Sequence, residues 1–492
     1  MKTENYNLIE EDWIPVLMKD GTFQRVSLNA VFSNGDSIAD LSLNAYERVA
    51  VMRFLICIAM AALDEKDLAN EPAWLRAKDK MCPAVTQYFK KWHNRFNFYG
   101  PHAFLQPDDL TVSKEEDFSS VSKIVFHCAS GNNGTLFDHA AIDDARIFSD
   151  HERVIAMLAY LNFCAGGRSS KCKWDGLETD SSVSAGPARE KSMVHTLVIG
   201  KSLVESVWLG LLTGDMISSL PAHSRGRPVW EGESYKRKWL TSNGDRHSLL
   251  ARLVPLSRVM KFQKGDHRLP LGEGLRFDSL PTAREPMATV RLRKGQKSEE
   301  YCYVSLSLEE APWRNLHAIL SVRENFGALN LRHITSCAME SISLWSGGLL
   351  TDGKAKDIAA LEWHITLPGN FMEEFALSIY RSGLENAKEW ADNQLRMAAK
   401  MYDEDMHIKW EEDFVYPRSK RLFWDVLEKC QPTLVRIATE ESDLKEWAEI
   451  VKKTARRVFV EACPHQTARQ MAAYVRAMGE LRELIRRRAR ND

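Results

Sequence analysis

The chain has 492 residues, which argues against one ordinary core, because a single hydrophobic core stops growing at roughly 250 to 300 residues. Hydrophobic residues make up 44% and charged residues 27%, a balance that is ordinary for globular proteins and argues against disorder and low complexity. A formal net charge of −1 argues against a uniformly basic nucleic-acid-binding protein, since affinity for phosphate backbones comes largely from Lys and Arg.

The first 35 residues predict a strand, a turn, a second strand and a helix. Apolar residues at 13–17 precede the turn signal Lys-Asp-Gly at 19–21, and apolar character resumes at 26–28. From 42 to 63, apolar residues recur at intervals of three and four, which predicts a helix. Its apolar stretch contains Arg53 and is too short to span a membrane, so we expect a buried helix.

The middle of the chain is irregular and predicts a mixture of helix and strand. Residues 165–188 are rich in Gly, Ser, Asp and Lys without periodicity, which predicts a loop. A loop of this length is more often functional or disordered than incidental. A second loop is expected at 130–134, an apolar helix at 197–212, and a hairpin at 290–306.

Past residue 368 the signal is almost continuously helical. Apolar residues recur at helical spacing in four segments, at 371–402, 422–437, 444–458 and 471–485. The second segment could be interrupted near Pro432. Four amphipathic helices with short connections predict an antiparallel bundle. We therefore expect an α+β fold, with a large mixed α/β N-terminal domain at 1–367 that carries long functional loops, and a C-terminal antiparallel four-helix bundle at 368–492.

The nine cysteines predict reduced, mostly buried thiols. Their number is odd, their spacing does not repeat, and no Cys-x-x-Cys pair occurs, so a zinc site of the usual kind is not expected. The sequence predicts no metal and no other cofactor. The polar N-terminus carries no apolar targeting region, and we expect a cytoplasmic protein.

Basic residues concentrate in two segments. Residues 252–297 contain eleven basic and four acidic residues, and residues 452–490 contain eleven basic and three acidic residues. Both segments are candidates for nucleic-acid contact. A solvated charged face is an equally good interpretation of either one.

The common enzyme signatures are absent from the sequence, including the phosphate-binding loop, the zinc-protease helix and the nucleophile elbow. The best remaining candidates for a catalytic site are Asp138, His139 and Asp143, because carboxylates and imidazoles are the ligands of hydrolytic metal centres. A metal-dependent nuclease or hydrolase centred on these residues is the alternative function. Helix capping or surface charge is the better explanation of these residues.

Several strings stand in a characteristic order along nearly the whole chain. They are Asn-Leu-Ile at 7–9, Trp-Ile-Pro-Val at 13–16, His-Ala-Phe-Leu-Gln at 102–106, Ser-Gly-Asn-Asn at 130–133, Leu-Phe-Asp-His at 136–139, Ala-Pro-Trp-Arg at 311–314 and Gly-Gly-Leu at 347–349. Together they resemble the large subunit of the type I-E CRISPR surveillance complex, Cascade. Ala103 replaces the proline of that family.

This resemblance implies a non-catalytic subunit that recognises the protospacer-adjacent motif in duplex DNA from the minor groove. It also implies that the subunit promotes strand separation and R-loop formation and helps to recruit a nuclease-helicase. Because the guide reads the target by base pairing, the protein needs to read only a few base pairs. The implied partners are the crRNA-containing complex with its backbone, handle-binding and small subunits, the double-stranded target and the nuclease-helicase, with no membrane. An assembly scaffold that does not read DNA is a further alternative.

The resemblance assigns contacts to three DNA-binding elements and one docking loop. A glycine loop lets backbone approach base edges, and its matching residues with their flanking cations are Gly166, Gly167, Arg168, Lys171 and Lys173. A basic finger is matched by Arg258 and Lys261. The wedge that splits the first base pairs is matched by Gly353 and Lys354, with no glutamine where the family usually has one. The loop that docks against the guide handle and a neighbouring subunit is matched by Ser130, Gly131, Asn132 and Asn133.

Each of these assignments competes with a plainer interpretation. The glycine loop could be an ordinary surface loop, the finger residues ordinary exposed cations, and the wedge a solvated turn. Some family members bind zinc through two Cys-x-x-Cys pairs. Residues 137–140 read Phe-Asp-His-Ala at the first of these pairs, so zinc is not expected.

Overall fold

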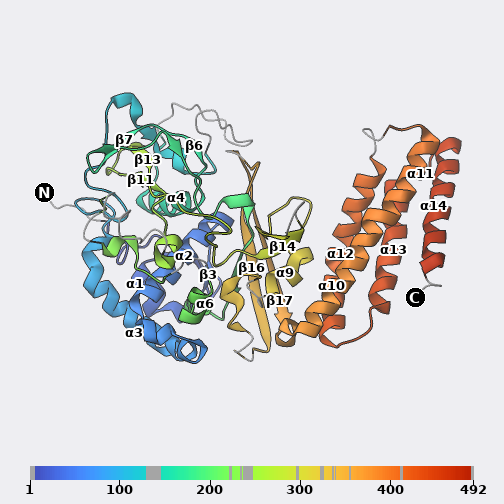
Figure 1. Ribbon diagram of the computed structural model, residues 1–492, viewed down its shortest axis with the longest axis horizontal. Helices are drawn as coiled ribbons and strands as arrows, with labels where there is room; N and C mark the ends of the chain where they lie inside the picture. Colours follow the sequence, from blue (N-terminus) through green and yellow to red (C-terminus); the bar gives the residue numbers. More distant parts are fainter. Residues whose placement is uncertain are drawn as a thin grey trace. The chain divides into compact units, whose positions relative to one another are not determined.

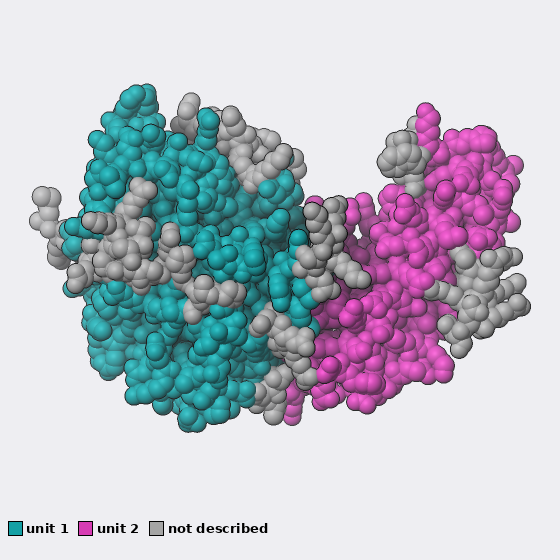
Figure 2. All heavy atoms as spheres, viewed as in Figure 1, with its two compact units in different colours: residues 1–307, 321–337, 342–366 teal, residues 308–320, 338–341, 367–492 magenta. Residues whose placement is uncertain are grey.

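A computed structural model divides the chain into two compact units, which are coloured separately in Figure 2. Unit 1 comprises residues 1–307, 321–337 and 342–366, and unit 2 comprises 308–320, 338–341 and 367–492. The described residues are 6–128, 146–220, 224–232, 235–236, 248–294, 299–321, 326–334, 337, 339–353, 356–409 and 414–488, without the side chains of 293, 294, 299 and 482–488. The long segment of unit 2 begins beside the expected domain boundary. Two short earlier segments also belong to unit 2, which the sequence did not predict.

The N-terminal elements follow the predicted order. β1 (Ile14–Met18) pairs with β2 (Phe23–Val26) on one side and with β3 (Ile38–Leu41) on the other, and both pairings are antiparallel. Helix α1 (Leu28–Ser33) begins after Ser27, whose hydroxyl oxygen accepts a hydrogen bond from the backbone N–H of Ala30. Trp13 lies buried ahead of the first strand. The prediction for this region is confirmed.

Helix α2 (Ala45–Ala62) lies inside unit 1, with nearly all of its residues buried. A helix that is apolar on all sides suits an interior position. The helices that pack against it are α3 (Glu71–Trp92), α4 (Asp150–Phe163), α5 (Leu203–Leu209) and α8 (Leu249–Leu253), of which α3 and α4 are labelled in Figure 1. The predicted buried helix is confirmed. None of the described helices is long and apolar enough to cross a membrane.

Arg53 of α2 is the centre of a buried ion network. Its guanidinium pairs with the carboxylate of Glu285, which also pairs with Arg252 of α8. Burial alone would raise the pKa of Glu285, but the charges of Arg252 and Arg53 lower it to about 2. Because an unpaired buried charge is strongly destabilising, each member of the network depends on the others.

The remaining strands form one larger sheet and several short antiparallel ribbons. The larger sheet has the order β10-β16-β17 and contains β10 (His195–Ile199), β16 (Ser341–Thr351) and β17 (Asp357–Pro368). The ribbons contain β4 (Thr111–Val112), β5 (Ser119–Ser120), β6 (Gly167–Arg168), β7 (Cys172–Trp174), β8 (Leu177–Glu178), β9 (Ser182–Val183), β11 (Arg258–Met260), β12 (Arg268–Leu269), β13 (Leu271–Glu273), β14 (Val290–Lys294) and β15 (Glu299–Tyr303). They pair as β4-β7-β8, β5-β12, β6-β9, β11-β13 and β14-β15.

Two predictions for the middle of the chain need correction. The expected loop at 165–188 contains the four short strands β6 to β9. The expected helix at 197–212 begins as the end of strand β10, and α5 starts only after Ser202, whose hydroxyl oxygen caps it by accepting a hydrogen bond from the backbone N–H of Glu205. The hairpin predicted at 290–306 is confirmed by β14 and β15.

Unit 2 is mainly helical. Its helices are α9 (Leu316–Leu320), α10 (Glu374–Glu389), a π-helical turn (Trp390–Leu395), α11 (Arg396–Met406), α12 (Val415–Thr439), α13 (Lys445–Ala462) and α14 (Ala468–Arg488). All four predicted helical segments are helical, and Pro432 does not interrupt α12. Helix α12 packs against α10 and α13, and α11 packs against α14 (Figure 1). The earlier segment joins this unit through Trp313, whose carbonyl accepts a hydrogen bond from the hydroxyl of Tyr380 at 3.0 Å.

Candidate nucleic-acid interface

The two glycines of the predicted glycine loop have different surroundings. Gly167 pairs with Val183 across the β6-β9 ribbon. A Cβ atom on Gly166 would lie 3.2 Å from the backbone nitrogen of Ala185 and 3.2 Å from the backbone oxygen of Val183. Gly167 has a φ of +138°, which other residues rarely adopt, and among the described residues nothing beyond its chain neighbours lies within 4 Å of its Cβ position. Gly166 therefore permits close packing between the two strands of the ribbon. At Gly167, the space that a Cβ atom would occupy is open.

Three predicted cations follow the glycines. Arg168 is exposed in β6, and Lys173 is exposed in β7 between two buried residues. The ammonium of Lys171 pairs with Glu178 at 3.0 Å. Within the part of the chain that the structure describes, no ion pair is formed by Arg168 or Lys173. These two cations are therefore more available to a polyanion than Lys171.

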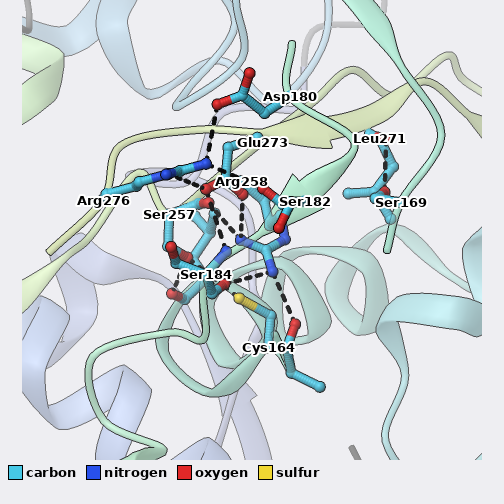
Figure 3. A network of polar contacts seen from close by, with 12 residues as sticks. Cys164, Ser169, Asp180, Ser182, Ser184, Ser257, Arg258, Leu271, Glu273 and Arg276 are labelled. Carbon is cyan, nitrogen blue, oxygen red and sulfur yellow. Dashed lines mark hydrogen bonds and ion pairs between the residues drawn. The ribbon is translucent and has the colours of Figure 1, made fainter. Parts of the chain in front are cut away.

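Arg258 is not an exposed finger residue, and this prediction is wrong. Its side chain is only 2% exposed and pairs with Glu273 at 3.2 Å. The same guanidinium donates hydrogen bonds to the carbonyls of Ala165 and Ser184, at 2.8 and 2.6 Å. Figure 3 shows Arg258 inside this network. The guanidinium of Arg258 is therefore bonded within the protein, beside the backbone of the glycine loop, and is not available to DNA.

Lys261 is also held within the chain. Its ammonium donates a hydrogen bond to the carbonyl of Asp108. Beyond it, Lys264 is exposed at the tip of the connection between β11 and β13, next to Gly265 with a φ of +77°. Its exposure at this turn makes Lys264 a further candidate for the finger cation, beside Lys261. The turn signal Gln-Lys-Gly-Asp at 263–266 marks this position in the sequence, but the sequence analysis did not use it.

The tip of this connection is fixed by a buried arginine. Arg153 of α4 donates hydrogen bonds to the carbonyls of Gln263 and Asp266, at 3.1 and 2.8 Å. Both bonds end on the backbone on either side of Lys264. The side chain of Lys264 is therefore presented from a fixed backbone.

Several of the described basic residues at 252–297 are bonded within the protein. Arg252 and Arg258 are buried in ion pairs with Glu285 and Glu273, and Arg284 donates to the carbonyl of Gly327. The exposed members Arg268 and Arg276 pair with Glu115 and Asp180, at 2.6 and 2.9 Å. In the described part of this segment, these cations are therefore paired with groups of the same protein.

The predicted wedge falls on the turn between β16 and β17. The backbone N–H of Asp352 donates to the carbonyl of Lys356 at 3.0 Å, and the N–H of Lys356 donates to the carboxylate of Asp352 at 3.1 Å. Gly353 has a φ of +77°. Lys354 lies outside the described residues. The two ends of the turn are thus closed by hydrogen bonds on both sides of the predicted wedge residue.

Arg189 and Ser192 join the glycine loop to this turn. The Arg189 guanidinium donates to the carbonyl of Phe163, the last residue of α4, at 3.1 Å, and pairs with Asp357 of β17 at 2.5 Å. The Thr351 backbone N–H donates to the Ser192 hydroxyl oxygen at 3.0 Å. Burial raises the pKa of Asp357, although the charge of Arg189 opposes this. Two predicted DNA-binding elements therefore share one supporting segment.

His195 of β10 supports the same region from inside. Its ring Nε2 lies 3.1 Å from the carbonyl oxygen of Ala188, and its ring Cδ2 would lie 3.4 Å from a Cβ atom on Gly348. Burial, with a smaller effect of the Arg53 charge, lowers the pKa of His195 to about 4. This histidine is therefore a neutral core residue at pH 7.

The remaining predicted residues cannot be placed. The docking-loop residues Ser130, Gly131, Asn132 and Asn133 lie outside the described residues, as do Asp138, His139 and Asp143 of the alternative metal site. Among the residues that the structure describes, no group of three or more His, Cys, Asp or Glu side chains could hold a metal ion. All nine cysteines are free thiols.

The chain is similar to known proteins over nearly its whole length. The model of a family described as CRISPR-associated protein Cse1 matches residues 7–458. The CRISPR-associated protein CasA/Cse1 of Thermus thermophilus is 26% identical, over 98% of this chain and 99% of the relative.

Solved structures share the fold of this chain. Thermobifida fusca Cse1 matches with a TM-score of 0.81 at 18% identity, covering 99% of both chains. Thermus thermophilus CasA (Cse1) matches with a TM-score of 0.75 at 21% identity, covering 98% of this chain and 100% of that one. A chain of a CRISPR RNA-guided surveillance complex matches with a TM-score of 0.75 at 17% identity, covering 97% and 99%.

Proposed function

The chain belongs to the CRISPR-associated protein Cse1 family, and we propose that it reads the protospacer-adjacent motif for a type I-E CRISPR surveillance complex. It contacts the motif in duplex DNA from the minor groove and promotes strand separation and R-loop formation. Its role is non-catalytic, and it helps to recruit a nuclease-helicase that performs the cleavage. Since the guide reads the target by base pairing, a few protein contacts to the motif suffice.

The observation that carries this proposal is the open backbone at Gly167. With no side chain and an unobstructed Cβ position, this residue lets the main chain approach base edges in a groove only about 6 Å wide. Arg168 and Lys173 stand exposed in the neighbouring strands and supply attraction to the phosphates on either side. Lys264 takes the place of the finger cation. Lys171, which is paired with Glu178, makes a smaller contribution.

The other proposed contacts follow the family pattern. Gly353 and Lys354 form the wedge, with lysine in place of glutamine, and the closed turn around them provides a rigid base. Ser130 to Asn133 dock against the guide handle and a neighbouring subunit. Helices α10 and α11, which the π-helical turn joins into one continuous helix, form an antiparallel four-helix bundle with α12, α13 and α14. This assembly works in the cytoplasm, where the target DNA is.

The test is a binding selection with the reconstituted guide complex. Duplexes carry one matched target and a randomised flanking motif, and bound molecules are sequenced. We expect a narrow set of motifs with the complete complex, and a broad set when Gly167→Ala and Lys354→Ala are combined in a complex that still assembles. An unchanged motif set in that complex would favour a scaffold role instead. Metal-dependent cleavage by the purified chain that His139→Ala abolishes would favour the nuclease alternative.

A further inference from the structure

We propose that Arg258 is the positioning residue of the glycine loop and that it determines motif specificity without touching DNA. This inference rests on the proposed reading function of Gly167. The side chain is buried and cannot reach a ligand, yet its hydrogen bonds end on the backbone beside the loop. It acts through the geometry of that backbone.

The guanidinium joins the two arms of the ribbon. One nitrogen, Nη2, donates both to the carbonyl of Ala165, directly before Gly166, and to the carbonyl of Ser184, directly after β9. The two carbonyls belong to segments 19 residues apart in the sequence and meet on one nitrogen atom. Loss of this nitrogen would leave two partly buried carbonyls without a shared donor, and the two arms of the ribbon would be free to separate.

Glu273 holds Arg258 in place and contacts the ribbon itself. Its Oε2 accepts from Nη1 of Arg258 at 3.2 Å, and its Oε1 accepts from the backbone N–H of Ser184 at 3.2 Å. Arg276 adds a second arginine, which donates to Oε1 of Glu273 at 3.1 Å and to the carbonyl of Ser182 at 3.0 Å. In Figure 3 the side chains of Arg258 and Arg276 both point toward Glu273. The arm opposite Gly167 is therefore fixed at the carbonyls of Ser182 and Ser184.

Further contacts fix the base of the loop. The hydroxyl of Ser257 donates to the carbonyl of Leu161 at 2.5 Å and lies 3.4 Å from the sulfur of Cys164. The backbone N–H of Gly186 donates to the carbonyl of Cys164 at 2.8 Å. The chain thus leaves α4 in one defined direction, and Arg258 sets the spacing of the two strands that follow.

Lysine cannot replace this arginine. The planar guanidinium presents several N–H donors in a fixed fork, whereas an ammonium is a single point charge on a flexible chain. Arg258→Lys keeps the charge and removes the fork. A residue that contacts phosphate tolerates this change better than a residue that donates to four acceptors in fixed positions, as Arg258 does.

The experiment compares Arg258→Lys with Arg48→Lys in the reconstituted guide complex. Arg48 is a matched control, because it is also buried and also contacts a carboxylate, that of Asp40, and a carbonyl, that of Leu41. The readouts are the ratio of affinities for a preferred and a non-preferred motif, and the slope of log affinity against log salt. We expect Arg258→Lys to reduce the ratio about tenfold, the effect of one lost charge-assisted hydrogen bond, and to leave the salt slope unchanged. Arg48→Lys should change neither readout.

The possible outcomes separate this inference from the proposed function. If Gly167→Ala reduces the ratio and Arg258→Lys does not, the positioning role is refuted and the reading function stands. If neither variant reduces it, the reading function itself is wrong. A salt slope lowered by about 0.9 in Arg258→Lys would identify a direct phosphate contact and overturn the inference. An equal effect of Arg48→Lys would show general destabilisation and would also overturn it.

A second variant decides the matter if Arg258→Lys prevents assembly. Arg276 is half-exposed, so Arg276→Gln should fold while losing its bond to the Ser182 carbonyl. With this variant we expect the ratio of affinities for the preferred and the non-preferred motif to fall several-fold. The slope of log affinity against log salt should again stay unchanged. An unchanged ratio would refute it.

Discussion

The strongest prediction concerns Gly167→Ala. An alanine must either keep the φ of +138° or force β6 into another conformation. Holding a non-glycine residue in such a region costs about 1 to 3 kcal/mol. If the free ribbon relaxes and must regain this conformation on binding, affinity for the preferred motif falls roughly 5- to 150-fold, since about 1.4 kcal/mol corresponds to a factor of ten. If the conformation is kept, the new methyl group occupies the open side and obstructs the approach of a base pair.

The assay is equilibrium binding of the assembled complex to duplexes with a preferred and a non-preferred motif. Gly176→Ala is the matched control, because Gly176 has a φ of +72°, an equally open Cβ position and a place in the turn between β7 and β8. It should cost similar stability and change affinity by less than about twofold. Wild-type affinity for the preferred motif in Gly167→Ala would refute the reasoning. So would an equal loss in Gly176→Ala.

Three further predictions test other parts of the structure. Lys264→Ala should weaken binding to all duplexes alike and reduce the salt slope by about 0.9, and an unchanged slope would exclude a phosphate contact. The folded state keeps His195 neutral, so stability should fall as the pH drops from about 6.5 to about 4, by about 3 kcal/mol for this group. Urea unfolding at pH 7 and pH 5 should show a smaller decline for His195→Gln, and equal declines would contradict the burial argument. Glu285→Gln leaves Arg53 and Arg252 buried without a carboxylate, so we expect a loss of about 3 to 5 kcal/mol and a clearly lower melting temperature in calorimetry. A melting temperature within about 1 °C of the wild type would show that the network tolerates neutralisation.

Local periodicity explains which elements could be predicted. The long helices of unit 2 repeat their apolar residues every three or four positions, and α2 is an almost unbroken apolar run; both signals lie in neighbouring residues. Strands β6 and β9 have two residues each, too few to show alternation, and they pair across a long connection. The apolar run that begins at Leu197 is equally suited to strand and helix, and its pairing with β16 decided the outcome.

The candidate site also contains residues that the sequence could identify and residues that it could not. Gly166 and Gly167 could be identified because the glycines stand in the sequence themselves. The burial of Arg258 could not, because it depends on Glu273, fifteen residues later, and on the carbonyl of Ala165, 93 residues earlier. A basic segment looks alike in sequence whether its charges face solvent or carboxylates of the same protein. Only the fold shows which cations remain exposed.

The shared support of the glycine loop and the wedge turn determines how substitutions there must be interpreted. Arg189 contacts Phe163 at the base of the loop and Asp357 beside the turn, so a change at Asp357 releases a guanidinium that also holds the loop. Residues in one such network couple, and their effects do not add. A loss of strand opening in an Asp357 variant therefore cannot be assigned to the wedge alone. Arg168 is exposed and takes no part in this ion pair, so we expect its substitution to leave the common support intact and to report on the proposed DNA contact alone.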